Sequence, residues 1–179
     1  MASAPALFVH EAVLARLASL KPRPWEVGGW LLGYWADDAR SLFVTHLTPP
    51  TAGRPWKVTI SGRGHRRYFD EAWDASGGEV TFLGDWHTHP GVAATPSRRD
   101  RLALVKLATE PDYGTPRPLI AIVKTGRWPW QQGAPEPRFY LGDEEGETAE
   151  LTARAAAALP ALAARVPRWP WPTPSTTLS

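Results

Sequence analysis

The sequence predicts a mixed fold of the α/β or α+β class, built as one domain. Apolar, β-branched segments such as residues 119–124 read as buried strands, and they alternate with amphipathic segments such as residues 11–20, which read as helices. The chain has 179 residues, enough for one sizeable hydrophobic core. Hydrophobic residues make up 43% of the chain and charged residues 21%, as in ordinary globular proteins.

In the first half of the chain, turn and breaker residues separate short strands and helices. Pro22 and Pro24 end the first helix, and Gly77-Gly78 ends the second. Gly28 and Gly29 weaken the interior of a strand, which indicates either a close approach of a ligand or backbone, or a simple bulge. The expected elements are strands over residues 6–10, 26–35, 40–47 and 56–61, and helices over residues 11–20 and 63–75.

The second half is expected to open with a strand over residues 79–84 that continues toward two histidines. The alanines and leucines of residues 148–165 predict a helix, which Pro160 should kink or split. The domain is expected to span residues 1–166. Residues 167–179 form a tail rich in Pro and Trp, either disordered or packed extended against the body. The other expected elements are a helix over residues 98–107 and strands over residues 119–124 and 138–141.

Composition excludes several classes of protein. The absence of cysteine excludes disulfides and thiolate metal sites, and with them the zinc deaminases that use a Cys pair. No leader with a basic region and an apolar run, and no stretch of 18 apolar residues, is visible, so we expect a cytoplasmic protein without a membrane span. A net charge of +2 does not require a nucleic-acid partner, and the ten tryptophans are interpreted as core and groove rings.

Residues 84–100 carry the chemistry of the chain. His87 and His89 stand at positions i and i+2, so on a strand both side chains project to the same face. Pro90 ends the strand, and Ser97 is a plausible N-cap of a helix with Asp100 in its first turn. Two imidazoles and one carboxylate are three metal ligands, and catalytic zinc uses three protein ligands and one open position. Taken singly, the histidines could be surface or core residues, and Ser97 with Asp100 could be only a capping box.

The pattern His-x-His-Pro, six residues, Ser, two residues, Asp resembles the JAMM motif of MPN/JAB-domain metallopeptidases (Mov34/MPN/PAD-1-like). That family also has a glutamate just before Gly-Gly and an apolar strand, and Glu26-Val27-Gly28-Gly29 fits. The resemblance covers residues 7–145 and implies a three-layer α-β-α fold with a central mixed sheet, related to cytidine deaminases. It also implies one Zn2+ per chain, held by the three ligands His87, His89 and Asp100.

The same resemblance implies that Glu26 is the general acid/base and that Ser97 stabilises the oxyanion; otherwise Glu26 would be a surface residue beside a turn. It implies a zinc-dependent peptidase or isopeptidase that cleaves after the C-terminal Gly of a ubiquitin-like protein. The form Gly84-Asp85-Trp86-His87 is closest to the prokaryotic branch, which includes anti-phage systems of the CBASS type and enzymes acting on sulfur-carrier proteins. The partner would therefore be a protein ending in Gly-Gly, and the sequence indicates no oligomeric state.

Substrate contacts are expected from tryptophans that would narrow a channel for Gly-Gly and from arginines that would receive an acidic or C-terminal tail. The rival interpretations are a metallohydrolase of small or peptide amides and a non-catalytic scaffold. Asp85 either orients a ligand imidazole or is a strand-edge acid, which we favour, and His10, His46 and His65 are interpreted as structural or surface residues. The expected substrate-contact residues are Trp25, Trp30, Trp86, Arg98 and Arg99.

Overall fold

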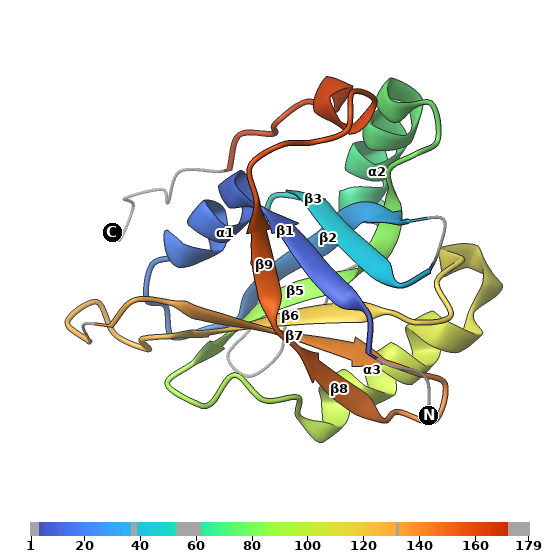
Figure 1. Ribbon diagram of the computed structural model, residues 1–179. Coiled ribbons are helices and arrows are strands. Elements are labelled where there is room, and N and C mark those ends of the chain that lie inside the picture. Colours follow the sequence, from blue (N-terminus) through green and yellow to red (C-terminus); the bar gives the residue numbers. More distant parts are fainter. Residues whose placement is uncertain (1–3, 37–38, 53–61, 132, 172–179) are drawn as a thin grey trace.

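The computed structural model describes residues 4–36, 39–52, 62–131 and 133–171 (Figure 1). Its helices are α1 (Glu11–Ala18), α2 (Gly62–Ser76) and α3 (Arg98–Thr109), with 3-10 turns η1 (Pro111–Tyr113) and η2 (Ala163–Arg165). Its strands are β1 (Ala6–His10), β2 (Val27–Trp35), β3 (Ser41–Leu47), β4 (Thr51–Ala52), β5 (Thr81–Pro90), β6 (Leu119–Thr125), β7 (Glu136–Gly142), β8 (Thr148–Leu151) and β9 (Ala153–Ala156).

All nine described strands belong to one mixed sheet, in the order β8-β7-β6-β5-β2-β3-β1-β9, with β4 paired to β2. β5 lies in the middle, antiparallel to β2 and parallel to β6. Thr152 alone separates the two edge strands β8 and β9, so one stretch of chain supplies both edges and the sheet curls back on itself (Figure 1). Such closure leaves fewer unpaired edge groups for other chains to pair with.

The helices divide between the two faces of the sheet. Side chains of α1 pack against one face, in a core cluster that includes Val13, Leu31 and Trp86. On the opposite face, α2 covers Trp30 and Phe82, and α3 covers the part of the sheet formed by β6 and β7. The predicted α/β class with a central mixed sheet is therefore confirmed, with helices on both faces.

Two glycines allow the central strands to approach their neighbours. A Cβ on Gly29 would lie 2.7 Å from Thr48 Oγ1 and 2.8 Å from Trp86 Nε1. Gly84 has φ +146, and a Cβ there would lie 1.9 Å from the Leu119 carbonyl oxygen. Gly29 thus marks a close approach to Thr48 and Trp86, and the register shift between β2 and β5 falls instead between Leu31 and Leu32.

The predicted helix over residues 148–165 is wrong. Residues 148–151 pair with β7, residues 153–156 pair with β1, and only Ala163–Arg165 form a short 3-10 turn. Helix propensity of Ala and Leu is a weak preference, worth less than about 0.7 kcal/mol per residue, and pairing with exposed sheet edges overrides it. Leu151 is buried while Glu150 lies at the surface, with its Oε1 3.3 Å from Arg138 Nη1 of β7.

The first part of the predicted tail packs against the body of the protein. Trp169 is buried and its Nε1 donates a 2.7 Å hydrogen bond to Glu71 Oε2 of α2. The ring of Trp171 stacks on Trp86 with 5.1 Å between ring centroids. For residues 167–171 the docked alternative is therefore the correct one. The strand predicted over residues 56–61 and the rest of the tail lie outside the described residues.

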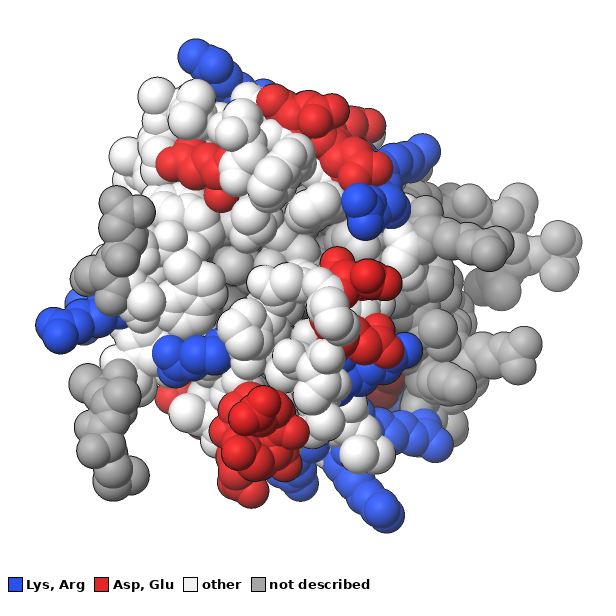
Figure 2. Space-filling view, turned by 90° about the vertical axis from the view of Figure 1, so that its right-hand side faces the viewer, with Lys and Arg blue, Asp and Glu red and all other residues white. Residues whose placement is uncertain are grey.

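Two observations concern the helices and one face of the surface. Within the described ranges, no helix combines the length and the apolar character that a membrane span needs. Figure 2 shows one face of the molecule on which acidic and basic side chains are interspersed, so this face carries no continuous basic surface of the kind that nucleic acids require.

His65 gives the fold a predicted pH dependence. Its imidazole is fully buried on α2, with Nδ1 2.7 Å from Thr48 Oγ1, and burial lowers its pKa from 6.5 to about 4. The folded state favours the neutral His65 ring. The resulting contribution to the unfolding free energy is complete above the pKa of the unfolded chain and is lost as the pH falls toward the pKa of the folded protein. Between about pH 7 and about pH 4.5, wild type should lose on the order of 2 kcal/mol more unfolding free energy than His65→Gln. Urea denaturation measures both curves, and parallel curves would contradict the prediction.

Candidate metal centre

The candidate metal centre lies at the carboxyl end of β5, in the middle of the sheet. His87 and His89 project to the face that α2 and α3 cover. Trp86, the residue before His87, points to the opposite face and packs in the core that contains α1. Both imidazoles are buried, with 4% and 6% of their surface exposed. Together with Asp100 they form a group whose ligand atoms all lie within 4.8 Å of one another. The structure thus brings together the three residues that the sequence singled out as ligands.

The three side chains form a small triangle. His87 Nε2 lies 3.0 Å from His89 Nε2, and the Asp100 carboxylate oxygens lie 3.3 Å and 3.5 Å from these two nitrogens. The second ring nitrogen of His89, Nδ1, lies 2.8 Å from the Ala93 carbonyl oxygen. Because a carbonyl oxygen only accepts hydrogen bonds, Nδ1 carries a hydrogen. In the neutral ring, the form that binds a metal, the Nε2 lone pair therefore points into the triangle.

Asp100 is positioned by the first turn of α3. Ser97 is the N-cap: its Oγ accepts a hydrogen bond from the Asp100 N–H at 3.3 Å, and its own N–H donates to Asp100 Oδ2 at 2.6 Å. This is the capping box that the sequence suggested as an alternative interpretation. Ser97 is the cap and Asp100, the candidate ligand, is the other half of the capping box, so the helix start fixes the carboxylate beside the histidines.

The electrostatics of the triangle favour a cation. Burial by itself lowers the pKa of His89, but the hydrogen bonds to Asp100 and Ala93 and the charges of Asp100 and Glu26 outweigh it, and the pKa is raised. Burial by itself raises the pKa of Asp100, but the hydrogen bonds from His87, His89 and Ser97 outweigh it and hold this pKa well below its usual range. The carboxylate is therefore ionised at neutral pH and creates a negative potential at the ring nitrogens.

Glu26 lies next to this triangle. The antiparallel register pairs Gly28 of β2 with His87 of β5, and the Val27 N–H donates to Thr88 Oγ1, which brings Glu26, the residue before β2, toward the end of β5. Its charge is one of the groups that raise the pKa of His89, which agrees with this placement. The side chain is half-buried. An acid about 60 residues away in sequence is thus brought beside the candidate ligands by strand pairing.

The geometry fits a metal ion. Ligands at about 2.0 to 2.1 Å around a tetrahedral zinc ion lie about 3.3 Å from one another. The three edges of the triangle, 3.0, 3.3 and 3.5 Å, are close to that value. Two imidazole nitrogens and one carboxylate are also the donor types of a catalytic centre that keeps one position open. The described residues therefore fit a single divalent ion of the zinc type.

The predicted substrate-contact residues divide into two groups. Trp25 is 36% exposed directly before Glu26, and Arg98 and Arg99 are exposed in the first turn of α3. Trp30 and Trp86 are 5% and 0% exposed and belong to the two core clusters. Little of either ring is exposed, although Trp30 also lines a cavity of about 310 Å3 with Phe69 and Phe82, and the substrate contacts of both tryptophans stay predictions.

The interpretation of Asp85 as a strand-edge acid is also wrong. β5 has neighbours on both sides, and Asp85 pairs with Trp30 of β2 and Ile120 of β6. Burial raises its pKa to about 7, and its Oδ1 has no hydrogen-bond partner within the described part of the chain. The order of the strands, which the sequence does not reveal, decides that this carboxyl lies inside the sheet.

Sequence reasoning missed the surroundings of the triangle. The Ala93 carbonyl that orients His89 is a backbone group, and residue type gives no signal for it. A cavity of about 260 Å3 lies beside the end of β5, where Lys124 pairs with His89. It is formed by Gly91, the end of β6 and the β6–β7 loop, which projects on the left of Figure 1. Lys124, Gln131 and Glu136 line it, and no motif marks them in the sequence.

A curled mixed sheet with helices on both faces, and a His-His-Asp group at the end of its central strand, define an α/β domain with a single-metal centre. The chain belongs to the family described as prokaryotic homologs of the JAB domain, whose family model matches residues 10–139. The resemblance to MPN/JAB domains stated from the motif is therefore confirmed.

Individual relatives share part of their length with this chain. A protein of Sinorhizobium fredii named probable metalloprotease y4qB is 29% identical over 116 residues, which cover 59% of this chain and 66% of that protein. A Pseudomonas aeruginosa protein named CD-NTase/cGAS isopeptidase is 33% identical over 101 residues, covering 55% of this chain and 61% of that protein. The chain thus spans between about half and two thirds of the length of these relatives.

The solution structure of protein DSY2949 from Desulfitobacterium hafniense is similar in fold. Its TM-score is 0.59 at 19% sequence identity, and the match covers 86% of this chain and 94% of that one. At this identity the similarity shows the fold alone.

The ligand assignment predicts metal content. Wild type should hold about one metal ion per chain, and His89→Ala and Asp100→Ala should hold close to none, because two remaining ligands bind a divalent ion far more weakly than three. Elemental analysis of proteins purified without chelator measures this. Asp74→Ala, an exposed acid on α2, is the matched control and should keep the metal. Metal retained by Asp100→Ala would contradict the assignment.

The capping box predicts a second, smaller effect. Ser97→Ala removes the Oγ acceptor of the Asp100 N–H and should lower the unfolding free energy by about 1 kcal/mol. Because the cap also orients the carboxylate, metal affinity should fall too, as it does when groups that orient a ligand are removed, by about tenfold or more. Competition with a chromophoric chelator measures the affinity, and Ser97→Thr, which keeps the hydroxyl, should restore it. An unchanged metal affinity in Ser97→Ala would contradict the claim that the cap orients Asp100 for metal binding.

Proposed function

We propose that this chain is a zinc-dependent peptidase or isopeptidase that hydrolyses the amide bond after the C-terminal Gly of a ubiquitin-like protein. The observation that carries the proposal is that Glu26, an acid just before β2, lies close enough to the His-His-Asp triangle for its charge to raise the pKa of His89. A structural metal site needs no such acid, whereas amide hydrolysis needs a group that moves a proton.

Zinc at this triangle would supply a Lewis acid for the amide carbonyl and a water with a pKa lowered to about 7. Glu26 takes the proton of the attacking water on its carboxylate and delivers it to the nitrogen of the leaving amine. His89 is held in one orientation by the Ala93 carbonyl. Ser97 Oγ already accepts a hydrogen bond from the Asp100 N–H, so its hydroxyl hydrogen remains for the oxygen that becomes negative in the transition state.

The names of the relatives support an amide bond in a protein as the substrate. Several are named CD-NTase/cGAS isopeptidase, and an isopeptidase cleaves an amide formed by a side-chain amine. Trp25, 36% exposed directly before Glu26, is proposed as the wall of a channel that admits the narrow Gly-Gly tail. Arg98 and Arg99, exposed beside Asp100, are proposed to bind acidic groups of the same tail. A role in cytoplasmic anti-phage defence is part of this proposal.

The role of Glu26 predicts a separation of binding from turnover. Glu26→Gln keeps the shape of the side chain but cannot accept a proton at neutral pH, so metal content should stay at the wild-type level while turnover falls by about 10²-fold or more. Elemental analysis and single-turnover cleavage of a ubiquitin-like fusion measure the two quantities. Glu79→Gln, distant in sequence and on the α2–β5 connection, is the control and should keep both. Full turnover in Glu26→Gln would point to a non-catalytic scaffold or to another acid.

The proposed preference for a Gly-Gly tail predicts that the rate of cleavage depends on the last residue of that tail. Replacing the last Gly of the fusion partner by Ala adds a methyl group next to the scissile bond, and kcat/KM should fall by about tenfold or more if the channel is narrow. Trp25→Ala should recover part of the loss for the Ala substrate, because it removes the wall. Equal rates for both substrates would favour a peptidase of small amides without a Gly requirement.

A further inference from the structure

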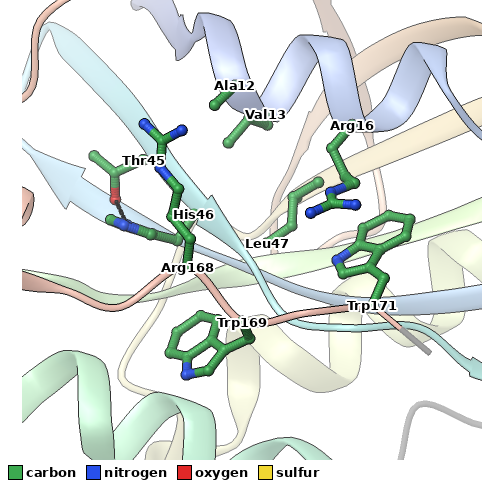
Figure 3. A pocket seen from close by; sticks show the side chains of 9 residues that line it. All are labelled: Ala12, Val13, Arg16, Thr45, His46, Leu47, Arg168, Trp169 and Trp171. Carbon is green, nitrogen blue, oxygen red and sulfur yellow. Dashed lines mark hydrogen bonds between the residues drawn. The ribbon is translucent and has the colours of Figure 1, made fainter. Parts of the chain in front are cut away.

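A second pocket lies away from the metal centre, between α1, β3 and the chain that follows η2 (Figure 3). Its volume is about 90 Å3, several times the space that one water molecule needs. Figure 3 shows Arg16 running from α1 toward Trp171 on one side of it, and Arg168 running from the extended C-terminal segment toward α1 on the other. The lining residues are Ala12, Val13, Arg16, Thr45, His46, Leu47, Arg168, Trp169 and Trp171.

The pocket has an excess of positive charge. Its lining includes two guanidinium groups and no carboxylate, and within the described ranges neither Arg16 nor Arg168 forms a salt bridge. Burial and then the charges of His10 and Arg168 lower the pKa of His46 in the pocket wall to about 4. The pocket lining thus holds positive charges and no negative charge to balance them, which favours binding of an anion.

Aromatic contacts border the pocket, and both of its arginines are exposed. The guanidinium carbon of Arg16 lies 4.9 Å from the centre of the Trp171 ring, which also stacks on the ring of Trp86. The backbone that carries Arg168 is held by its neighbour Trp169, whose Nε1 donates a 2.7 Å hydrogen bond to Glu71 Oε2 of α2. A guanidinium that stacks on an indole keeps its N–H donors free at its edge, where they form two parallel hydrogen bonds to oxyanions.

The aromatic walls indicate what kind of anion fits. The Trp171 ring is already covered by Trp86 and Arg16, and Trp169 is buried between the rings of His46 and Tyr68. Neither indole offers an open face on which a nucleobase could stack. The ligand is therefore compact, and two guanidinium groups match the double charge of a phosphate better than the single charge of a carboxylate.

We propose that this pocket is a binding site for a phosphate group, either inorganic phosphate or the phosphate of a small monoester. Its oxygens accept hydrogen bonds from Arg16 and Arg168 in front of the His46 wall. The site does not depend on the proposed hydrolytic activity, because its residues are distinct from the metal ligands and from Glu26.

The test is a titration of the full chain with inorganic phosphate, with glycerol phosphate and with acetate at constant ionic strength. Binding is followed by NMR of the arginine side chains and of His46. We expect saturable binding of the two phosphates, a rise in the pKa of His46 in the complex, and binding of acetate at least about tenfold weaker. The tighter of the two phosphate ligands identifies the source. No saturable binding of either phosphate, or equal binding of acetate, would overturn the proposal.

Variants separate this site from others. Arg168→Gln and Arg16→Gln should each weaken phosphate binding by about tenfold, whereas Arg165→Gln, an exposed arginine in η2 outside the pocket lining, should change it by less than about twofold. His89→Ala, which disables the metal centre, should bind phosphate as wild type does. Equal losses in Arg165→Gln and Arg168→Gln, or loss of binding in His89→Ala, would assign the effect to general charge or to the metal centre instead.

Discussion

The antiparallel pairing of β2 with β5 fixes where the acid and the imidazoles of the metal centre meet. With Gly28 opposite His87, Glu26 comes close enough for its charge to raise the pKa of His89, and alternation along β5 turns both histidines to the face that α3 covers. A slip of one residue would turn the histidines into the core around α1. Close contact of Gly29 with Thr48 and Trp86 and the positive φ of Gly84 lock this register.

The third ligand depends on a helix start. The capping box that begins α3 joins Asp100 to Ser97 by two hydrogen bonds, from the Ser97 N–H to the carboxylate and from the Asp100 N–H to Ser97 Oγ, and the same carboxylate faces both histidines. One side chain therefore serves the helix and the metal centre together. Because a cap holds its residue in one conformation, the carboxylate needs little rearrangement on binding a cation, and this preorganisation favours affinity.

The chain after β9 connects parts of the structure that the sheet leaves apart. Trp169 reaches α2, and Trp171 stacks on Trp86, the residue that precedes His87. The wall of the proposed phosphate pocket is thus in contact with the strand that carries the histidines. This segment closes the edge of the α1 core and forms the pocket at the same time, so a sequence that reads as a Pro/Trp-rich tail has a packing role over residues 167–171.

The sequence by itself determined the local features of this protein. The i and i+2 spacing of His87 and His89, the cap at Ser97 and most strands follow from alternation, turn residues and capping, which act over a few neighbouring positions. Only the tertiary structure decided the position of Glu26 near His89, the burial of Asp85 and Trp86, and the strands in place of the helix predicted over 148–165. Those outcomes depend on strand order and edge pairing between residues far apart in the chain, and such pairing outweighs local propensity.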